Sequence, residues 1–138
     1  MDDEKLDLTN FKKALTSLYE ALDEYRKDEA NLFVRDSCIK RFEYCYDISK
    51  KILIKHLKNI GEEEIDNNSL ADNIRLGAKK GILLHSWDVW DEYRLNRNTT
   101  SHGYDEKVAI KVVEKLNNFL IELEHLLDQL TEYYETQI

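Results

Sequence analysis

Apolar residues recur along this chain every three or four positions, which is the spacing of one face of an α-helix. In the first segment the apolar positions are Leu8, Phe11, Leu15, Leu18, Leu22 and Tyr25. Residues 28–31 interrupt the pattern, and a second segment then runs to about Ile60, where Gly61 is expected to end the helix. A last segment continues from residue 108 to residue 134, with Asp105 as a plausible N-cap. The pattern predicts a long helix over each segment.

Two more helices are expected between Gly61 and Asp105. Ser69, with Asp72 three residues later, resembles a capping box that opens a short helix ended by Gly81. Apolar residues from Leu83 to Tyr93 suggest a fourth helix, which reaches residues 97 and 98 before the hydroxyl cluster 99–101 breaks the periodicity. We therefore expect an all-α fold, an up-and-down four-helix bundle with one additional short helix, as a single domain over residues 1–138.

Composition supports this fold class. The 138 residues include no proline and only four glycines, too few for the turns of an all-β or α/β fold of this length. The apolar runs are too short for a membrane span, and the N-terminus, Met1-Asp2-Asp3-Glu4, is acidic where an export signal would be basic. The sequence therefore predicts a cytoplasmic protein with no membrane partner.

The charge of the chain restricts its binding partners. A net charge of −8 argues against a general nucleic-acid binder, so we expect no DNA partner. The charge is uneven, however, because residues 35–58 carry seven bases and three acids. Lys50 to Lys58 are expected to form an ordinary solvated helix face. Arg35, Asp36 and Arg41 favour a charge network inside the bundle, although Arg35 and Arg41 are also candidates for binding RNA or a nucleotide.

Metal and cofactor sites are not indicated. Cys38 and Cys45 lie seven residues apart on one helix, about 10 Å between Cα atoms, which is too far for a disulfide. They are expected to be buried small apolar residues. The four histidines are scattered singly, so no set of ligands has metal-binding spacing, and we expect neither a metal nor a cofactor.

The best candidate site is the polar run from Arg97 to Tyr104, between two helical segments. Arginine offers a planar fork of donors for phosphate, histidine can exchange protons near neutral pH, and the hydroxyl of Tyr104 lies two residues beyond His102. A structural alternative is that Arg97 and His102 only cap the end of the fourth helix while Tyr104 packs on the bundle. Trp87 and Trp90 favour core or interface packing over nucleotide stacking.

This run, together with several separated motifs in the same order, resembles the HEPN-fold ribonuclease toxins and the related nucleotidyltransferase substrate-binding proteins. The motifs are Asn10-Phe11-Lys12-Lys13-Ala14-Leu15, Arg35-Asp36, Ile39-Lys40-Arg41-Phe42-Glu43-Tyr44, Gly81-Ile82, Trp90 and Arg97-Asn98-Thr99-Thr100-Ser101-His102-Gly103-Tyr104-Asp105. The resemblance covers most of the chain.

The resemblance implies a homodimer with the catalytic residues Arg97, Asn98 and His102 in a cleft at the dimer axis. It also implies an RNA substrate and a small partner nucleotidyltransferase, the antitoxin, which adenylylates Tyr104. Two hypotheses remain open: an endoribonuclease toxin, and a non-catalytic subunit that binds substrate for a separate nucleotidyltransferase. The intact Arg-Asn-x3-His-x-Tyr set favours the first, whereas the acidic composition favours the second. A structural helical dimer with no ligand is the third alternative.

Overall fold

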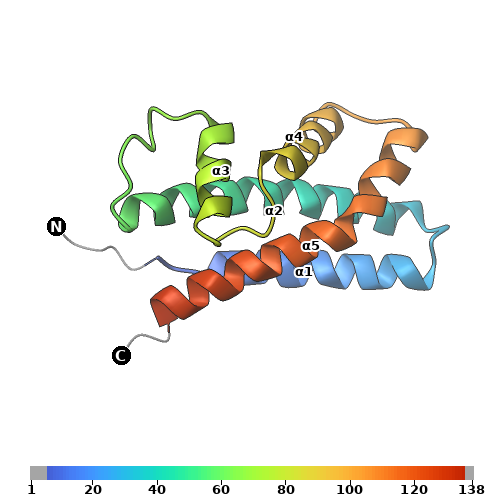
Figure 1. Ribbon diagram of the computed structural model, residues 1–138. Coiled ribbons are helices and arrows are strands. Elements are labelled where there is room, and N and C mark those ends of the chain that lie inside the picture. The colour runs from blue at the N-terminus through green and yellow to red at the C-terminus, as the bar shows by residue number, and fades with distance from the viewer. Residues whose placement is uncertain (1–5, 136–138) are drawn as a thin grey trace.

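The computed structural model describes residues 6–135, which form five α-helices and no strand (Figure 1). The helices are α1 (Thr9–Lys27), α2 (Leu32–Asn59), α3 (Leu70–Lys79), α4 (Trp87–Thr100) and α5 (Glu106–Glu135). The all-α prediction and the helical bundle are therefore confirmed. The acidic residues 1–4, on which the argument against an export signal depends, lie outside the described residues.

The helices α1, α2 and α5 run side by side along the long axis of the molecule, with α3 and α4 on the side of α2 away from α1 (Figure 1). Each helix buries its apolar stripe, and the buried residues of all five helices form one hydrophobic core. At its centre Phe42 of α2 and Phe119 of α5 pack edge to face, with ring centroids 4.9 Å apart. Trp90 of α4 packs against Phe119, which ties α4 to this core.

The predicted helix ends around the second and third helices are confirmed. Gly61 has a φ of +84°, which favours glycine, and its N–H donates to the carbonyl of Lys58 to end α2. The Ser69 hydroxyl accepts from the Asp72 N–H at 3.1 Å and so caps α3. The capping box is only half formed, because the carboxylate of Asp72 pairs with Arg75.

The predicted start of the fourth helix at Leu83 is wrong, because α4 begins at Trp87. Two contacts explain the difference. The Leu83 N–H donates to the carbonyl of Gly77 and thereby helps to end α3. The buried carboxylate of Glu122 on α5 accepts from the backbone N–H groups of Leu84 and His85, at 2.7 and 3.1 Å. These contacts hold residues 82–86 as a loop.

The end of α4 also differs from the prediction, because Thr99 and Thr100 remain helical. The Thr99 hydroxyl donates back to the carbonyl of Leu95 at 2.7 Å, and the Thr100 hydroxyl lies 3.1 Å from the carbonyl of Asn96, contacts that threonine makes within a helix. The helix stops one residue before Ser101, and Gly103 then turns the chain with a φ of +98°. Asp105 caps α5 as predicted, accepting from the Val108 N–H at 2.9 Å.

Both cysteines are buried and unpaired, as predicted. Burial raises the pKa of the Cys38 thiol to about 11 and that of Cys45 to about 12, so both stay protonated near neutral pH. Cys45 donates through Sγ to the carbonyl of Ala14 at 3.2 Å, across the α1–α2 interface. These residues are part of the core packing, and neither has the character of a reactive thiolate.

Candidate functional site

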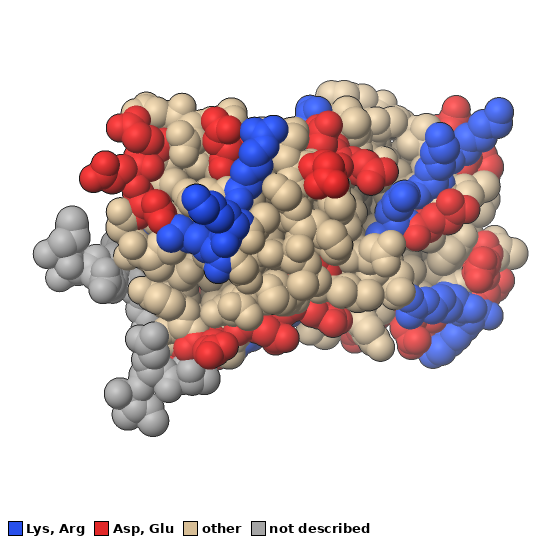
Figure 2. All heavy atoms as spheres, in the orientation of Figure 1, with Lys and Arg blue, Asp and Glu red and all other residues tan. Residues whose placement is uncertain are grey.

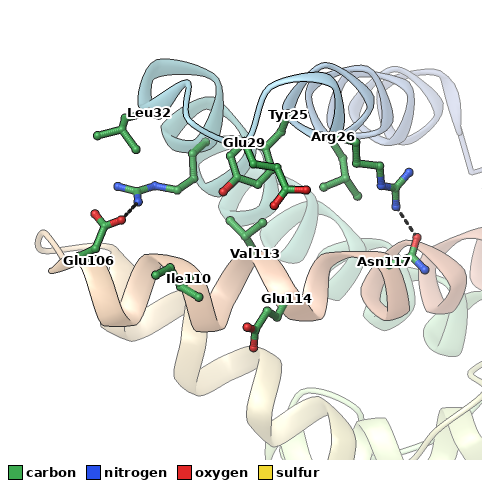
Figure 3. A pocket seen from close by; sticks show the side chains of 11 residues that line it. Tyr25, Arg26, Glu29, Leu32, Glu106, Ile110, Val113, Glu114 and Asn117 are labelled. Carbon is green, nitrogen blue, oxygen red and sulfur yellow. Dashed lines mark hydrogen bonds and ion pairs between the residues drawn. The ribbon is translucent and has the colours of Figure 1, made fainter.

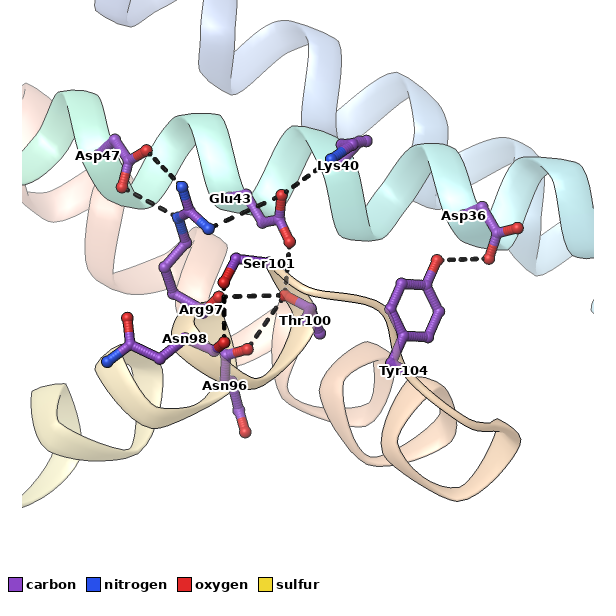
Figure 4. Close-up of polar contacts among 10 residues, drawn as sticks. All are labelled: Asp36, Lys40, Glu43, Asp47, Asn96, Arg97, Asn98, Thr100, Ser101 and Tyr104. Carbon is purple, nitrogen blue, oxygen red and sulfur yellow. Dashed lines mark hydrogen bonds and ion pairs between the residues drawn. The ribbon is translucent and has the colours of Figure 1, made fainter.

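The helix α2 presents a row of polar side chains to the end of α4 and to the turn that follows it (Figure 4). The row consists of Asp36, Lys40, Glu43 and Asp47. Their spacing of four, three and four residues places them on one face of the helix. Glu43 is only 6% exposed, so its carboxylate depends on polar contacts with neighbouring side chains.

Arg97 is directed to this row by the packing of α4. Trp90, Tyr93 and Thr100, which are buried, lie on the same helix face as Arg97. The guanidinium donates from Nε to Asp47 Oδ1 at 3.1 Å and from Nη2 to Asp47 Oδ2 at 3.0 Å, while Nη1 lies 3.9 Å from Glu43 Oε1. This is a bidentate pair, which fixes the plane of the fork. The hydrogen bond to Asp47 raises the pKa of Arg97, so the group stays charged.

Thr100 joins the same polar contacts from one turn further along α4. Its Oγ1 donates to Glu43 Oε2 at 2.6 Å. Lys40 lies 3.4 Å from the other oxygen of Glu43. The carboxylate of Glu43 is therefore shared among Thr100, Lys40 and Arg97, which explains how a charged group can remain almost fully buried here.

Tyr104 is tied to the other end of the row. Its hydroxyl donates to Asp36 Oδ1 at 2.6 Å (Figure 4). The ring is half-buried against the core, and burial, followed by the hydrogen bond to Asp36, raises the pKa of Tyr104 to about 12. The phenol is therefore protonated near neutral pH, and the carboxylate of Asp36 is the group placed to accept its proton.

His102 differs from Arg97 and Tyr104 in having no such tie. It follows the C-cap residue Ser101 directly and is exposed. Within residues 6–135, no hydrogen bond or ion pair involves its ring. The suggestion that Arg97 and His102 merely cap α4 finds no support, because the Arg97 side chain points to α2 and the carbonyls at this helix end are met by hydroxyls.

A cleft of about 400 Å³ lies between α2, α4 and the start of α3. Its lining includes Arg97 and Asn98, two of the predicted site residues, together with Lys50, Arg94 and Asp47. His102 and Tyr104 do not line it. Arg94 stacks 5.7 Å from the Trp87 ring and pairs with Asp91, whereas Lys50 lies 5.7 Å from the Tyr46 ring.

The sequence interpretation assigned no role in the site to Asp47 or Arg94, and it treated Lys50 as ordinary solvated surface. The spacing of these residues in the sequence does indicate part of the arrangement. Arg94 precedes Arg97 by three residues, and Asp47 follows Glu43 by four, so each pair shares a helix face. Nothing in the sequence shows, however, that these two faces meet.

The two remaining predicted residues lie elsewhere. Arg35 is buried and pairs with Glu106 at 2.6 Å and with Asp36 at 3.8 Å. Arg41 donates to the carbonyl of Ser17 at 2.7 Å, between α1 and α2. Neither lines the cleft. Arg35 makes the ion pairs of the charge network that the sequence favoured, whereas Arg41 bonds to a neutral carbonyl and has no ion pair among the described residues.

Charged side chains of both signs are mixed on the surface. On the face shown in Figure 2, basic and acidic side chains alternate in small groups, with no continuous basic patch. In the part of the chain described here, no three His, Cys, Asp or Glu residues are grouped so that they could hold a metal ion. The same residues include no helix that is long and apolar enough to span a bilayer.

Comparison with known families identifies the class of protein. Residues 6–132 match the family described as nucleotidyltransferase substrate binding protein like, and the chain belongs to that family. The resemblance found in the sequence is thus confirmed at the level of the family.

Two Haemophilus influenzae proteins show how similar the relatives are. The chain is 34% identical over 96 residues to a protein named Probable ribonuclease HepT, in an alignment that covers 68% of this chain and 65% of that protein. The chain thus spans somewhat less than two thirds of this relative's length. It also superposes on the structure of HI0074, described as the fold of a substrate binding domain of a nucleotidyltransferase. The TM-score is 0.80 at 27% identity, over 90% of this chain and 98% of the other.

Proposed function

We propose that this chain is a metal-independent endoribonuclease, the toxin of a prokaryotic toxin–antitoxin pair, with Arg97 and His102 as its catalytic residues. The observation that carries the proposal is the end of α4, where Arg97 and Asn98 line a cleft and an exposed His102 follows five residues after Arg97. The similarity to a protein named as a probable ribonuclease supports it.

The chemistry needs few groups. The 2′-hydroxyl of the RNA attacks the adjacent phosphorus, a bond to that oxygen forms, and the bond from phosphorus to the 5′-oxygen of the next nucleotide breaks. His102 takes the proton from the 2′-hydroxyl or gives one to the leaving oxygen, and Arg97 stabilises the negative charge on the phosphate. Asn98 orients the phosphate or the histidine. The nucleophile comes from the substrate itself, so the reaction requires no metal-activated water.

A homodimer is part of the proposal, since the reaction has two proton transfers and each chain carries one His102, which does not line the cleft of its own chain. Two copies around a twofold axis would supply two histidines to one cleft. Light scattering is expected to give about twice the chain mass of 16.4 kDa. A monomer at micromolar concentration would contradict a shared site.

The pairing of Arg97 with Asp47 supports a defined role for the arginine. Two of its donors are held by one carboxylate, which fixes the guanidinium plane, while Nη1 faces Glu43 at the longer distance of 3.9 Å. A phosphate would compete with these carboxylates for the guanidinium. Lys50 lies in the same cleft as Asp47 and would offset its charge.

We further propose that a partner nucleotidyltransferase silences the site by transferring adenylyl groups to Tyr104. The tyrosine oxygen attacks the α-phosphorus of ATP, pyrophosphate leaves, and Asp36 takes the phenolic proton. The modified residue would lose its bond to Asp36 and carry a negative phosphodiester two residues from His102. Intact mass measured after co-expression with the partner is expected to show added adenylyl units on the wild type but not on Tyr104→Phe. Inhibition without added mass would mean that the partner acts by binding alone.

A second candidate is a non-catalytic subunit that binds substrate for the nucleotidyltransferase. Its support is that Arg97 faces two carboxylates, Asp47 and Glu43, which compete with a phosphate. The description of HI0074 as the fold of a substrate binding domain also favours it.

Cleavage of single-stranded RNA in EDTA separates the two candidates. The wild-type protein is expected to cleave, His102→Ala to be inactive, and His125→Ala, on α5, to retain activity as the matched control. Cleavage that needs an added metal ion, or that survives in His102→Ala, would refute the ribonuclease assignment. A wild-type protein that binds RNA or a nucleotide without cleaving would favour the second candidate.

A further inference from the structure

A groove lies apart from the Arg97 cleft. It occupies about 470 Å³ between the end of α1, the start of α2 and the first turns of α5. Figure 3 shows Tyr25 of α1 and Leu32 of α2 on one side, with Ile110 and Val113 of α5 on the other. The activity proposed above uses none of these residues.

Two exposed apolar side chains line the groove. Leu32 and Ile110 are 49% and 45% exposed, and Phe33, the next residue of α2, is 90% exposed but does not line the groove. Exposed apolar residues in a concave site are suited to contact with another protein. Ile121, on the same helix α5, is equally exposed at 49% but does not line the groove.

The charges of the lining favour a basic occupant. Arg35 is neutralised by Glu106, at 2.6 Å, whereas Arg26 donates to the neutral amide of Asn117 at 2.7 Å and keeps its charge. Glu114 adds a further acid to the lining, so acids outnumber bases in it. Glu29, which lies over the groove in Figure 3, makes no ion pair within residues 6–135. Burial, followed by the charge of Glu29, raises the pKa of Tyr25, which lines the same groove. A Lys or Arg next to an apolar anchor would pair with Glu29.

The groove is connected to Tyr104 through Arg35. This side chain is 6% exposed, and its Nε–H is a buried donor at the groove that has no hydrogen-bond acceptor. The same guanidinium pairs with Glu106 and lies 3.8 Å from Asp36, the carboxylate that holds the Tyr104 hydroxyl. A molecule seated in the groove is therefore two contacts away from Tyr104.

We propose that this groove is the docking site for the partner nucleotidyltransferase, which inserts a large apolar side chain flanked by Lys or Arg. The proposal depends on the partnership proposed above. A second copy of this chain is the alternative occupant, and the oligomeric state of Ile110→Glu tests it. Docking at the groove would bring the partner's active site close to Tyr104.

Titration calorimetry with the purified partner nucleotidyltransferase proposed above tests the docking site. Ile110→Glu and Glu29→Lys are expected to weaken binding by about tenfold or more, as substitution at the centre of an interface does. Ile121→Glu on α5 and Glu20→Lys on α1 are the matched controls, being exposed positions outside the groove, and are expected to bind like the wild type. Circular dichroism would establish that all four variants are folded.

Each other outcome has a defined meaning. If the wild type binds and all four variants bind equally well, the groove is not the docking site, although the partnership stands. If the controls are weakened as much as the groove variants, the effect is not specific to the groove and the proposal fails. If Ile110→Glu changes only the oligomeric state of this chain, the groove belongs to a second copy. If the wild type does not bind the nucleotidyltransferase, both the docking site and the partnership are wrong.

Discussion

Arg97 and His102 are five residues apart in the chain but differ in how they are held. Arg97 is fixed by a bidentate pair with Asp47 and by the neighbouring Glu43, so its position is set by the packing of α4 on α2. His102 is exposed after the end of α4 and has no hydrogen bond within residues 6–135. Of the two residues proposed as catalytic, Arg97 is therefore held by the fold, whereas His102 is not.

The largest expected effects are on RNA cleavage. Comparing them with the effects on stability distinguishes His102 from Arg97. His102→Ala is expected to reduce RNA cleavage by about 10²–10⁴-fold, the usual contribution of a general acid or base, with the free energy of unfolding unchanged within about 0.5 kcal/mol. Arg97→Ala is expected to reduce cleavage by about 10²–10³-fold and also to lower the free energy of unfolding by about 1 kcal/mol, since solvent partly screens its ion pair.

Cleavage rates and urea unfolding of both variants give the comparison. A loss of stability in His102→Ala equal to that in Arg97→Ala would show that the histidine is held by the fold after all.

The next largest effect is on stability and concerns Glu43, the buried carboxylate beside Arg97. Glu43→Ala removes a neighbour of Arg97 and the nearest acceptor of the Thr100 hydroxyl, which keeps longer contacts within α4. Urea unfolding is expected to show a loss of about 1.5–3 kcal/mol, the usual contribution of a hydrogen bond to a charged group. Glu124→Ala, an exposed position on α5, is the control and should change stability by no more than about 0.5 kcal/mol. Equal stability in the two variants would mean that Glu43 does not organise the end of α4.

The sequence predicted the fold well because each helix carries its own apolar periodicity. The residues from Leu8 to Tyr25 define a face without reference to any other segment, and Gly61 marks a helix end by its own backbone freedom. The start of α4 was mispredicted because it depends on Glu122, almost forty residues further along the chain. Periodicity reports which face is buried, but not which carboxylate reaches across to another helix.

The same limit applies to the candidate site. The run from residue 97 to residue 104 was identifiable from its residue types, but its ties to α2 were not. Asp47 and Arg97 are fifty residues apart, and Asp36 and Tyr104 are sixty-eight apart. The groove needs three helices to exist at all, so no single stretch of sequence could indicate it.

A smaller effect tests whether Asp47 helps or hinders Arg97. Asp47→Asn removes one negative charge from the cleft, and single-stranded RNA is expected to bind about two- to fivefold more tightly, in line with the modest strength of partly exposed ion pairs. Fluorescence anisotropy in low salt would measure this change, with Asp128→Asn on α5 as the control. Weaker binding in Asp47→Asn would show that holding the guanidinium plane matters more than the competition between carboxylate and phosphate.

The smallest expected effect concerns His56, a histidine that is held in the core, in contrast to the exposed His102. His56 is buried, with Nδ1 2.7 Å from the Tyr134 hydroxyl, and its ring packs on Tyr133 while Lys80 lies nearby. Burial, followed by the charge of Lys80, lowers the pKa of His56 below its ordinary value of 6.5. The unfolded chain therefore takes up this proton at a higher pH than the folded chain. The contribution of His56 to stability is complete above about pH 6.5 and falls as the pH drops toward the folded-state pKa.

Thermal unfolding of the wild type is expected to show a lower melting temperature at pH 5 than at pH 7.5. In His56→Gln this difference should shrink, whereas in His102→Ala it should remain. An unchanged pH dependence in His56→Gln would assign the loss of stability to other groups.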